Sequence, residues 1–178
     1  MVLVFAILIA RTSFADPGIL LLAHGGSAEW NARVTELAAK VNATRATEVA
    51  FGMAARATIQ AAIDKLVARG VTEIVAVPLF VSSWSSVITS TEYLLGLRPQ
   101  APAALASYAK MNHAPAATSA AAPTGHEAHA QTADGTTPVR SPVPVRMTAA
   151  LNDHPIVAEI LTSRARAISL NQAGEALI

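Results

Sequence analysis

The residues most suited to chemistry stand at positions 24–27, where an apolar run ends in His24, Gly25, Gly26 and Ser27. The run itself, residues 18–23, is nearly continuous, as in a strand that is buried on both faces of a parallel sheet. Open α/β sheets bind their ligands beyond the carboxyl ends of such strands. An imidazole at that place can bind a metal ion or take up a proton at neutral pH. The alternative is a histidine that only caps or packs beside a tight turn.

The elements that must position this histidine alternate between strand-like and helix-like patterns. Strand-like runs occupy residues 18–23, 48–53, 71–81 and 145–151, with Pro78 expected near the end of the third run. Apolar residues at helical spacing follow the first two runs, namely Trp30, Val34, Leu37, Ala38 and Val41, and then Ile59, Ala62, Ile63, Leu66 and Val67. Helices are also expected over residues 85–97 and 155–169. We therefore predict an α/β three-layer sandwich with a central parallel sheet of about four strands flanked by helices.

The last of these helices should begin at residues 152–155, which offer an N-cap acceptor and a proline for the first turn. Its apolar positions recur at helical spacing and predict one buried face. The residues of that face are Val157, Ile160, Leu161, Arg164 and Ile168.

Composition narrows the chemistry further. The chain has 178 residues, 52% of them hydrophobic, which is enough for one domain with a sizeable core. Its formal net charge is +1, without a basic block and with few aromatic residues, so a nucleic-acid partner is not expected. It has no cysteine, which excludes disulfides, cysteine-bound zinc, iron–sulfur clusters and thiol nucleophiles. Histidine, aspartate and glutamate remain as metal ligands.

The domain expected over residues 16–170 is flanked and interrupted by other segments. Residues 1–15 resemble a signal segment and are too short to span a bilayer. They predict a periplasmic or secreted protein whose mature chain has no membrane span. The alternative is an ordinary N-terminal extension of a cytoplasmic protein. Residues 99–144 hold seven of the ten prolines and suggest a mobile Pro/Ala-rich insertion. Residues 171–178 look like the start of a second, missing repeat, or a short tail.

Four pieces in this order resemble the sirohydrochlorin and cobalt chelatases of the CbiX type. They are Leu-Ala-His-Gly-Gly-Ser at 22–27, Leu-Val-Ala-Arg-Gly at 66–70, Ile-Val-Ala-Val-Pro-Leu-Phe-Val at 74–81 and Asp-His-Pro at 153–155. The resemblance implies an enzyme that inserts Co²⁺, Fe²⁺ or Ni²⁺ into sirohydrochlorin or a related tetrapyrrole, with the metal as substrate and no organic cofactor. It also implies that His24 acts as the metal ligand or as the base that removes the pyrrole protons.

The same resemblance suggests how the substrate would bind. Gly25 and Gly26 would let a flat macrocycle approach the backbone, and Ser27 with the amides of the following helix would bind an acidic side arm. The loop at 82–86 lies after another strand, so Ser82, Ser83 and Ser86 are expected to contact substrate carboxylates, or else to form a turn.

The sequence departs from the family pattern at the second metal ligand. Members usually carry a second histidine in the loop at 82–86, where Trp84 or Ser86 stands, and often an acidic residue near the position of Met53. The residues that would complete the site are Glu92, His154, His113, His126 and His129. The pair at 126 and 129 surrounds a glutamate and could share one metal, or belong to a solvated linker. His154 could equally cap the helix that follows it.

These departures leave a second hypothesis open. The chain could be an exported protein of the same fold that binds a metal or a tetrapyrrole without catalysis. A homodimer, or a second covalent repeat, would be another way to complete the site. The His-Gly-Gly sequence also resembles the oxyanion loop of esterases, but no Gly-x-Ser-x-Gly nucleophile motif accompanies it.

Overall fold

The computed structural model describes residues 16–113, 135–170 and 174, and it confirms an α/β fold with four parallel strands. The strands stand in the order β2-β1-β3-β4 and are β1 (Pro17–Ala23), β2 (Thr47–Phe51), β3 (Glu73–Pro78) and β4 (Val145–Met147). The helices are α1 (Ala28–Asn42), α2 (Arg56–Ala68), α3 (Ser86–Leu94), α4 (Leu105–His113) and α5 (Pro155–Ile168). Within these described residues, no helix combines the length and apolarity needed to cross a bilayer.

Strand β1 lies in the middle of the sheet and pairs with both β2 and β3. Leu20 is the partner of Glu48 on one side and of Ala76 on the other. All three strands run in the same direction, so the residue after β1 lies beside the carboxyl ends of both neighbours. Since β1 ends at Ala23, this topology places His24 at the edge predicted to bind ligands.

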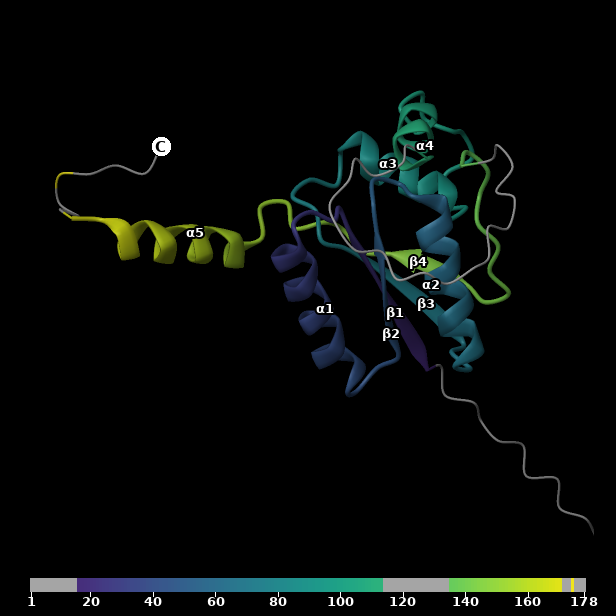
Figure 1. The fold of residues 1–178 in the computed structure, drawn as a ribbon, viewed down its shortest axis with the longest axis horizontal. Helices are drawn as coiled ribbons and strands as arrows, with labels where there is room; N and C mark the ends of the chain where they lie inside the picture. The colour runs from purple at the N-terminus through teal and green to yellow at the C-terminus, as the bar shows by residue number, and fades with distance from the viewer. Residues whose placement is uncertain (1–15, 114–134, 171–173, 175–178) are drawn as a thin grey trace, which may run out of the picture.

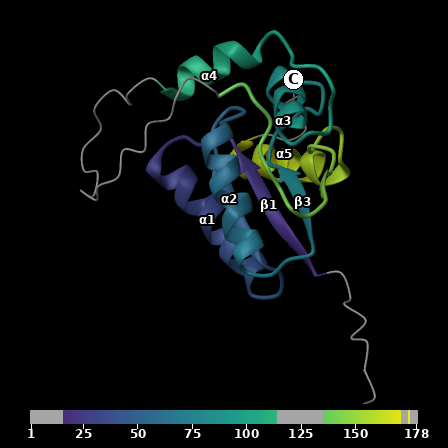
Figure 2. The same cartoon turned by 90° about the vertical axis from the view of Figure 1, so that its right-hand side faces the viewer.

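The two faces of the sheet are covered differently. Leu20, Leu22, Ile74 and Ala76 share one face, and the core they form includes residues of α2, α3 and α4. On the other face α1 is the covering helix, with Val34 and Ala38 buried. Figure 1 shows α1 and α2 on opposite sides of the sheet, and Figure 2 shows α3 and α4 at the end toward which the strands run. These are the three layers that the sequence predicts.

The prediction of a buried face on the last helix is wrong for this chain. Helix α5 has no buried residue and extends away from the sheet, as Figure 1 shows. The periodicity that predicts one apolar side is present, but periodicity does not specify which surface covers it.

The tract at 99–144 contains structure that its composition does not predict. Helix α4 buries Leu105 and Ala109, and the backbone N–H of Val139 donates to the carbonyl of Leu94 at 2.7 Å. Val143 packs against the core. These contacts bring together residues far apart in the sequence, so a local pattern does not reveal them.

Residues 114–134 lie outside the described part of the chain, as do 1–15 and all of 171–178 except 174. The predictions of a signal segment and of a second repeat are therefore untested.

Several of the predicted helices and strands are longer than those observed. The strand predicted over 71–81 is shorter at both ends, because β3 begins at Glu73 and ends at Pro78. Helix α3 ends at Leu94, before Gly96 with its φ of 76°. Such a left-handed backbone conformation favours glycine and ends a helix.

Candidate active site

His24 is exposed at the carboxyl end of β1, and its ring is oriented by its neighbour. Its Nδ1 lies 2.7 Å from the carbonyl oxygen of Gly25. A carbonyl oxygen can only accept a hydrogen bond, so Nδ1 carries the proton and donates. In the neutral ring the lone pair is then on Nε2, which is the form that binds a metal or takes up a proton.

The loop between His24 and α1 is held in place by the first turns of that helix. Asn31 accepts a hydrogen bond from the N–H of Gly26 at 3.0 Å and lies 3.4 Å from its carbonyl oxygen through Nδ2. Ser27 caps α1 by accepting from the N–H of Trp30 at 3.2 Å. Gly25 has a φ of 81°, which a side chain would disfavour. The predicted binding residues Gly25, Gly26 and Ser27 therefore form one ordered loop beside His24.

The serines after β3 are already engaged within the protein. Ser82 Oγ accepts from the N–H of Trp84 at 3.2 Å, and Ser86 Oγ lies 2.6 Å from the hydroxyl of Tyr108. Ser83 Oγ accepts two bonds, from the N–H of Ala150 at 2.9 Å and from Nδ2 of Asn152 at 3.0 Å. The loop after β3 is thus joined to the loop after β4.

His154 is the N-cap of α5. Its Nδ1 accepts from the N–H of Ile156 at 3.2 Å, so in the neutral ring the proton is on Nε2. This confirms capping, the alternative that the sequence left open. In this geometry His154 offers no ring lone pair to a metal.

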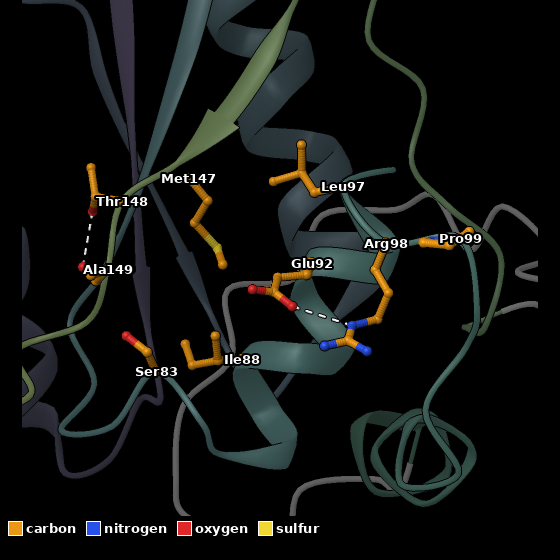
Figure 3. A pocket seen from close by; sticks show the side chains of 9 residues that line it. All are labelled: Ser83, Ile88, Glu92, Leu97, Arg98, Pro99, Met147, Thr148 and Ala149. Carbon is orange, nitrogen blue, oxygen red and sulfur yellow. Dashed lines mark hydrogen bonds and ion pairs between the residues drawn. The ribbon is translucent and has the colours of Figure 1, made fainter.

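Glu92 lies in a pocket between α3 and the end of β4, which Figure 3 shows. Its Oε2 is 3.3 Å from Nε of Arg98, and both side chains are partly exposed. The pocket has a volume of about 480 Å³ and also contains Ser83, with apolar walls from Ile88 and Met147. It can hold a small polar group beside a charged pair.

The carboxyl group of Glu36, which lies on α1 away from the loop of His24, has a lowered pKa. A hydrogen bond from Lys40 and its charge lower the pKa of the Glu36 carboxyl, and Arg33 contributes in the same direction. Both basic residues lie within one turn of Glu36 and form exposed ion pairs with it. These charges belong to the outer surface of the helix.

Comparison with known proteins decides the family. The sequence model of the CbiX family matches residues 18–168, which is most of the chain. The chain belongs to the CbiX family. This family comprises sirohydrochlorin cobalt- and ferrochelatases. Membership therefore implies two substrates, a tetrapyrrole and a divalent metal ion, without specifying which metal. A search of curated proteins finds no match.

A CbiX-family chelatase must bind a metal ion, so the positions of the candidate metal ligands matter. Across residues 16–113, 135–170 and 174, no group of three or more histidine, aspartate or glutamate side chains could hold one metal ion. His24, Glu92 and His154 are all described, so they do not form such a group. His126 and His129 lie outside the described residues, as does the side chain of His113. Trp84 is 81% exposed, at the loop where the resemblance predicts a histidine.

Three residues of this CbiX-family chain that contact the candidate site residues are missing from the sequence-based prediction. Asn31 holds the loop of His24, Tyr108 contacts Ser86, and Arg98 pairs with Glu92. An asparagine in the first turn of a helix after a Gly-Gly loop is a signal that could have indicated the first. Tyr108 lies in the tract interpreted as an insertion, and Arg98 follows the end of α3, so neither had a local signal.

Proposed function

We propose that this chain inserts Co²⁺, Fe²⁺ or Ni²⁺ into sirohydrochlorin or a closely related tetrapyrrole, with His24 as the metal ligand or the base. The family supports the reaction class. The observation that supports the residue is the bond from Nδ1 of His24 to Gly25, because it leaves the lone pair on the exposed ring at Nε2.

Metal insertion replaces two pyrrole N–H protons with one divalent ion. Nε2 of His24 could bind the ion before transfer or accept one proton at a time and release it to water, since the side chain is exposed. A single imidazole leaves most coordination positions of the ion free, and these are the positions that the pyrrole nitrogens must occupy. Both roles require the same nitrogen, so one substitution removes either.

The acidic side arms of the substrate have two binding places. The free amides at the start of α1, after Ser27, favour an anion. In the pocket beside β4, both acceptor positions of Ser83 Oγ are occupied, so its O–H is the group that it offers to a carboxylate. The Arg98 guanidinium lies in the same pocket, where it pairs with Glu92.

The test is an insertion assay with purified protein, sirohydrochlorin and Co²⁺, followed by the absorbance change of the macrocycle. We expect the change to be faster than the uncatalysed reaction, and His24→Ala to remove the acceleration. Equal rates for the original protein and His24→Ala would contradict the assignment of His24. A rate no faster than the protein-free mixture, with each of the three metals, would contradict catalysis.

A second function has a specific observation in its favour. Trp84 and Ser86 occupy the loop where the family usually places its second histidine, and neither is a good ligand for these metals. The chain would then be an exported protein that binds a metal or a tetrapyrrole without inserting one. Saturable binding of sirohydrochlorin without turnover would select this function, and loss of residues 1–15 from a protein recovered outside the cytoplasm would support export.

A further inference from the structure

The chain has two tryptophans, and both lie at the sheet edge that carries His24. Trp30 is in the first turn of α1, and Trp84 is in the loop between β3 and α3. These two residues are 48% and 81% exposed. An indole that is so exposed contributes little to a core, whereas aromatic side chains commonly line the sites where proteins bind ligands. The edge beside His24 therefore offers aromatic surface as well as an imidazole.

The loop that carries Trp84 begins beside the loop of His24. Leu22 is the partner of Pro78 in the sheet, and the N–H of Leu79 donates to the carbonyl of Leu22 at 2.8 Å. The chain thus leaves β1 and β3 at the same level of the sheet. Neighbouring strands are about 4.8 Å apart, so one flat macrocycle can contact both loops.

The backbone on both sides of Trp84 is held by bonds to other parts of the chain. On one side, the N–H of Ser83 donates to Oδ1 of Asn152 at 2.9 Å. On the other side, Ser86 Oγ lies 2.6 Å from the hydroxyl of Tyr108. Because the indole belongs to this anchored segment, a ligand that binds it has to fix little more than its two side-chain torsions. The loop after β3 is in this sense prepared for binding.

An indole and a histidine ring differ in what they can bind. Trp84 stands in the loop where the CbiX family usually places its second histidine. The indole N–H only donates, and its ring offers no lone pair to a transition metal. Its flat π surface favours another flat π surface in an offset stack. A tetrapyrrole macrocycle has such a surface, whereas a metal ion does not.

We propose that Trp84 is a substrate-binding residue whose indole stacks on the flat face of the tetrapyrrole, while His24 serves the metal or the pyrrole protons. The inference rests on the proposed function, from which it takes the tetrapyrrole. Stacking acts on the free and the metal-loaded macrocycle alike, so it strengthens binding more than it accelerates insertion. The loop after β3 thus contacts the ring, and it does so whichever metal is inserted.

The first experiment measures binding without turnover. Metal-free sirohydrochlorin is titrated into the full chain, and Kd is obtained from the absorbance change of the macrocycle. Trp84→Leu removes the aromatic surface and should raise Kd by about tenfold, within the range known for bases stacked on aromatic side chains. Trp84→Phe keeps a flat ring and should stay within about threefold of the original protein. Leu37→Ala is the control, because it shortens a partly exposed apolar side chain on α1 about two turns beyond Trp30.

The outcomes separate this inference from the proposed function. Failure of the original protein to bind sirohydrochlorin would overturn both. Binding by the original protein with an equal Kd for Trp84→Leu would overturn only the stacking and leave the role of His24 intact. A Kd for Trp84→Phe as high as that of Trp84→Leu would also overturn it. Urea unfolding should be the same for the original protein and the Trp84 variants, since this side chain is 81% exposed.

A nuclear magnetic resonance measurement tests the stacked geometry itself. With two tryptophans, the ¹⁵N-labelled chain has two indole N–H groups, and Trp84→Phe identifies the signal of one of them. The ring current of an aromatic macrocycle shifts protons above its face upfield and protons beside its edge downfield. We expect the indole signal of Trp84 to move upfield when metal-free sirohydrochlorin is added to saturation. A downfield shift, or none, would overturn the proposal.

Discussion

Two loops at the same edge of the sheet use a histidine in opposite ways. The loop at 24–27 follows β1, and the loop at 148–154 follows β4; each leads into a helix. In the first, His24 Nδ1 donates to Gly25 and leaves a lone pair on Nε2. In the second, His154 Nδ1 accepts from Ile156, so Nε2 carries the proton. The hydrogen-bond partner of one ring nitrogen therefore decides whether the other can bind a metal ion or take up a proton.

The loops also differ in how far their bonds extend. Bonds of the first loop stay within a few residues, since Asn31 and Ser27 hold it from the start of α1. The second loop is joined to the loop after β3, a segment 67 to 69 residues away in sequence, through Ser83. The first therefore keeps an open site, and the second fixes the position of an element.

The strongest test of this comparison exchanges each histidine for alanine. His24→Ala should lower kcat/KM for metal insertion by at least about 10²-fold, because it removes the ligand or base. His154→Ala should leave kcat/KM nearly unchanged and instead lower the free energy of unfolding by about 1 kcal/mol, the usual effect of losing an N-cap. Insertion rates and urea unfolding measure the two quantities. An equal loss of activity in both variants would remove the functional difference between the loops.

The second test concerns the bonds between the loops after β3 and β4. Asn152 has a φ of 47° and makes two side-chain bonds with Ser83. Asn152→Ala should therefore lower the free energy of unfolding by about 2–3 kcal/mol, from lost hydrogen bonds and a left-handed backbone. Asn152→Gly removes the bonds but tolerates the backbone, so it should cost about 1 kcal/mol less. Urea unfolding that gives equal values for both would show that the backbone conformation contributes little.

The third test concerns the conformation of the loop at 24–27. Gly25 has a φ of 81°, and a Cβ there would meet nothing closer than 3.7 Å, so the cost of Gly25→Ala is strain of the backbone. We expect the free energy of unfolding to fall by about 1–2 kcal/mol. Gly26→Ala is the control, because its φ is not positive and its Cβ would approach only the exposed ring of Trp30, at 3.3 Å. Thermal unfolding of both should rank Gly26→Ala as the milder; the reverse order would refute the explanation.

The smallest expected effect is an increase in metal affinity. Trp84→His would place an imidazole in the exposed loop after β3, where the resemblance predicts a second ligand. We expect several-fold tighter binding of Co²⁺ or Ni²⁺, measured by calorimetry without tetrapyrrole, and no gain for Trp84→Phe. A gain that survives the further change His24→Ala would mean that the new imidazole does not act together with His24.

Much of the fold follows from local patterns. The strands, α1 and α2 were predictable because residues buried on a strand or on one side of a helix recur at fixed spacing. Helix α4 was not, because its burial depends on Leu105 meeting a core made by distant residues. The site divides in the same way: the place of His24 at the end of β1 follows from the sequence, whereas Asn31, Tyr108 and Arg98 act through contacts that a linear pattern does not show.

The sequence by itself determined the parallel α/β arrangement, the family and the position of one histidine at the edge predicted to bind ligands, because each depends on short local patterns and their order along the chain. The tertiary structure decided which nitrogen of His24 and His154 is free, that Ser83 binds Asn152, and that the apolar side of α5 is left uncovered. These features depend on which groups meet in space, and hydrogen bonds and packing are set by that proximity.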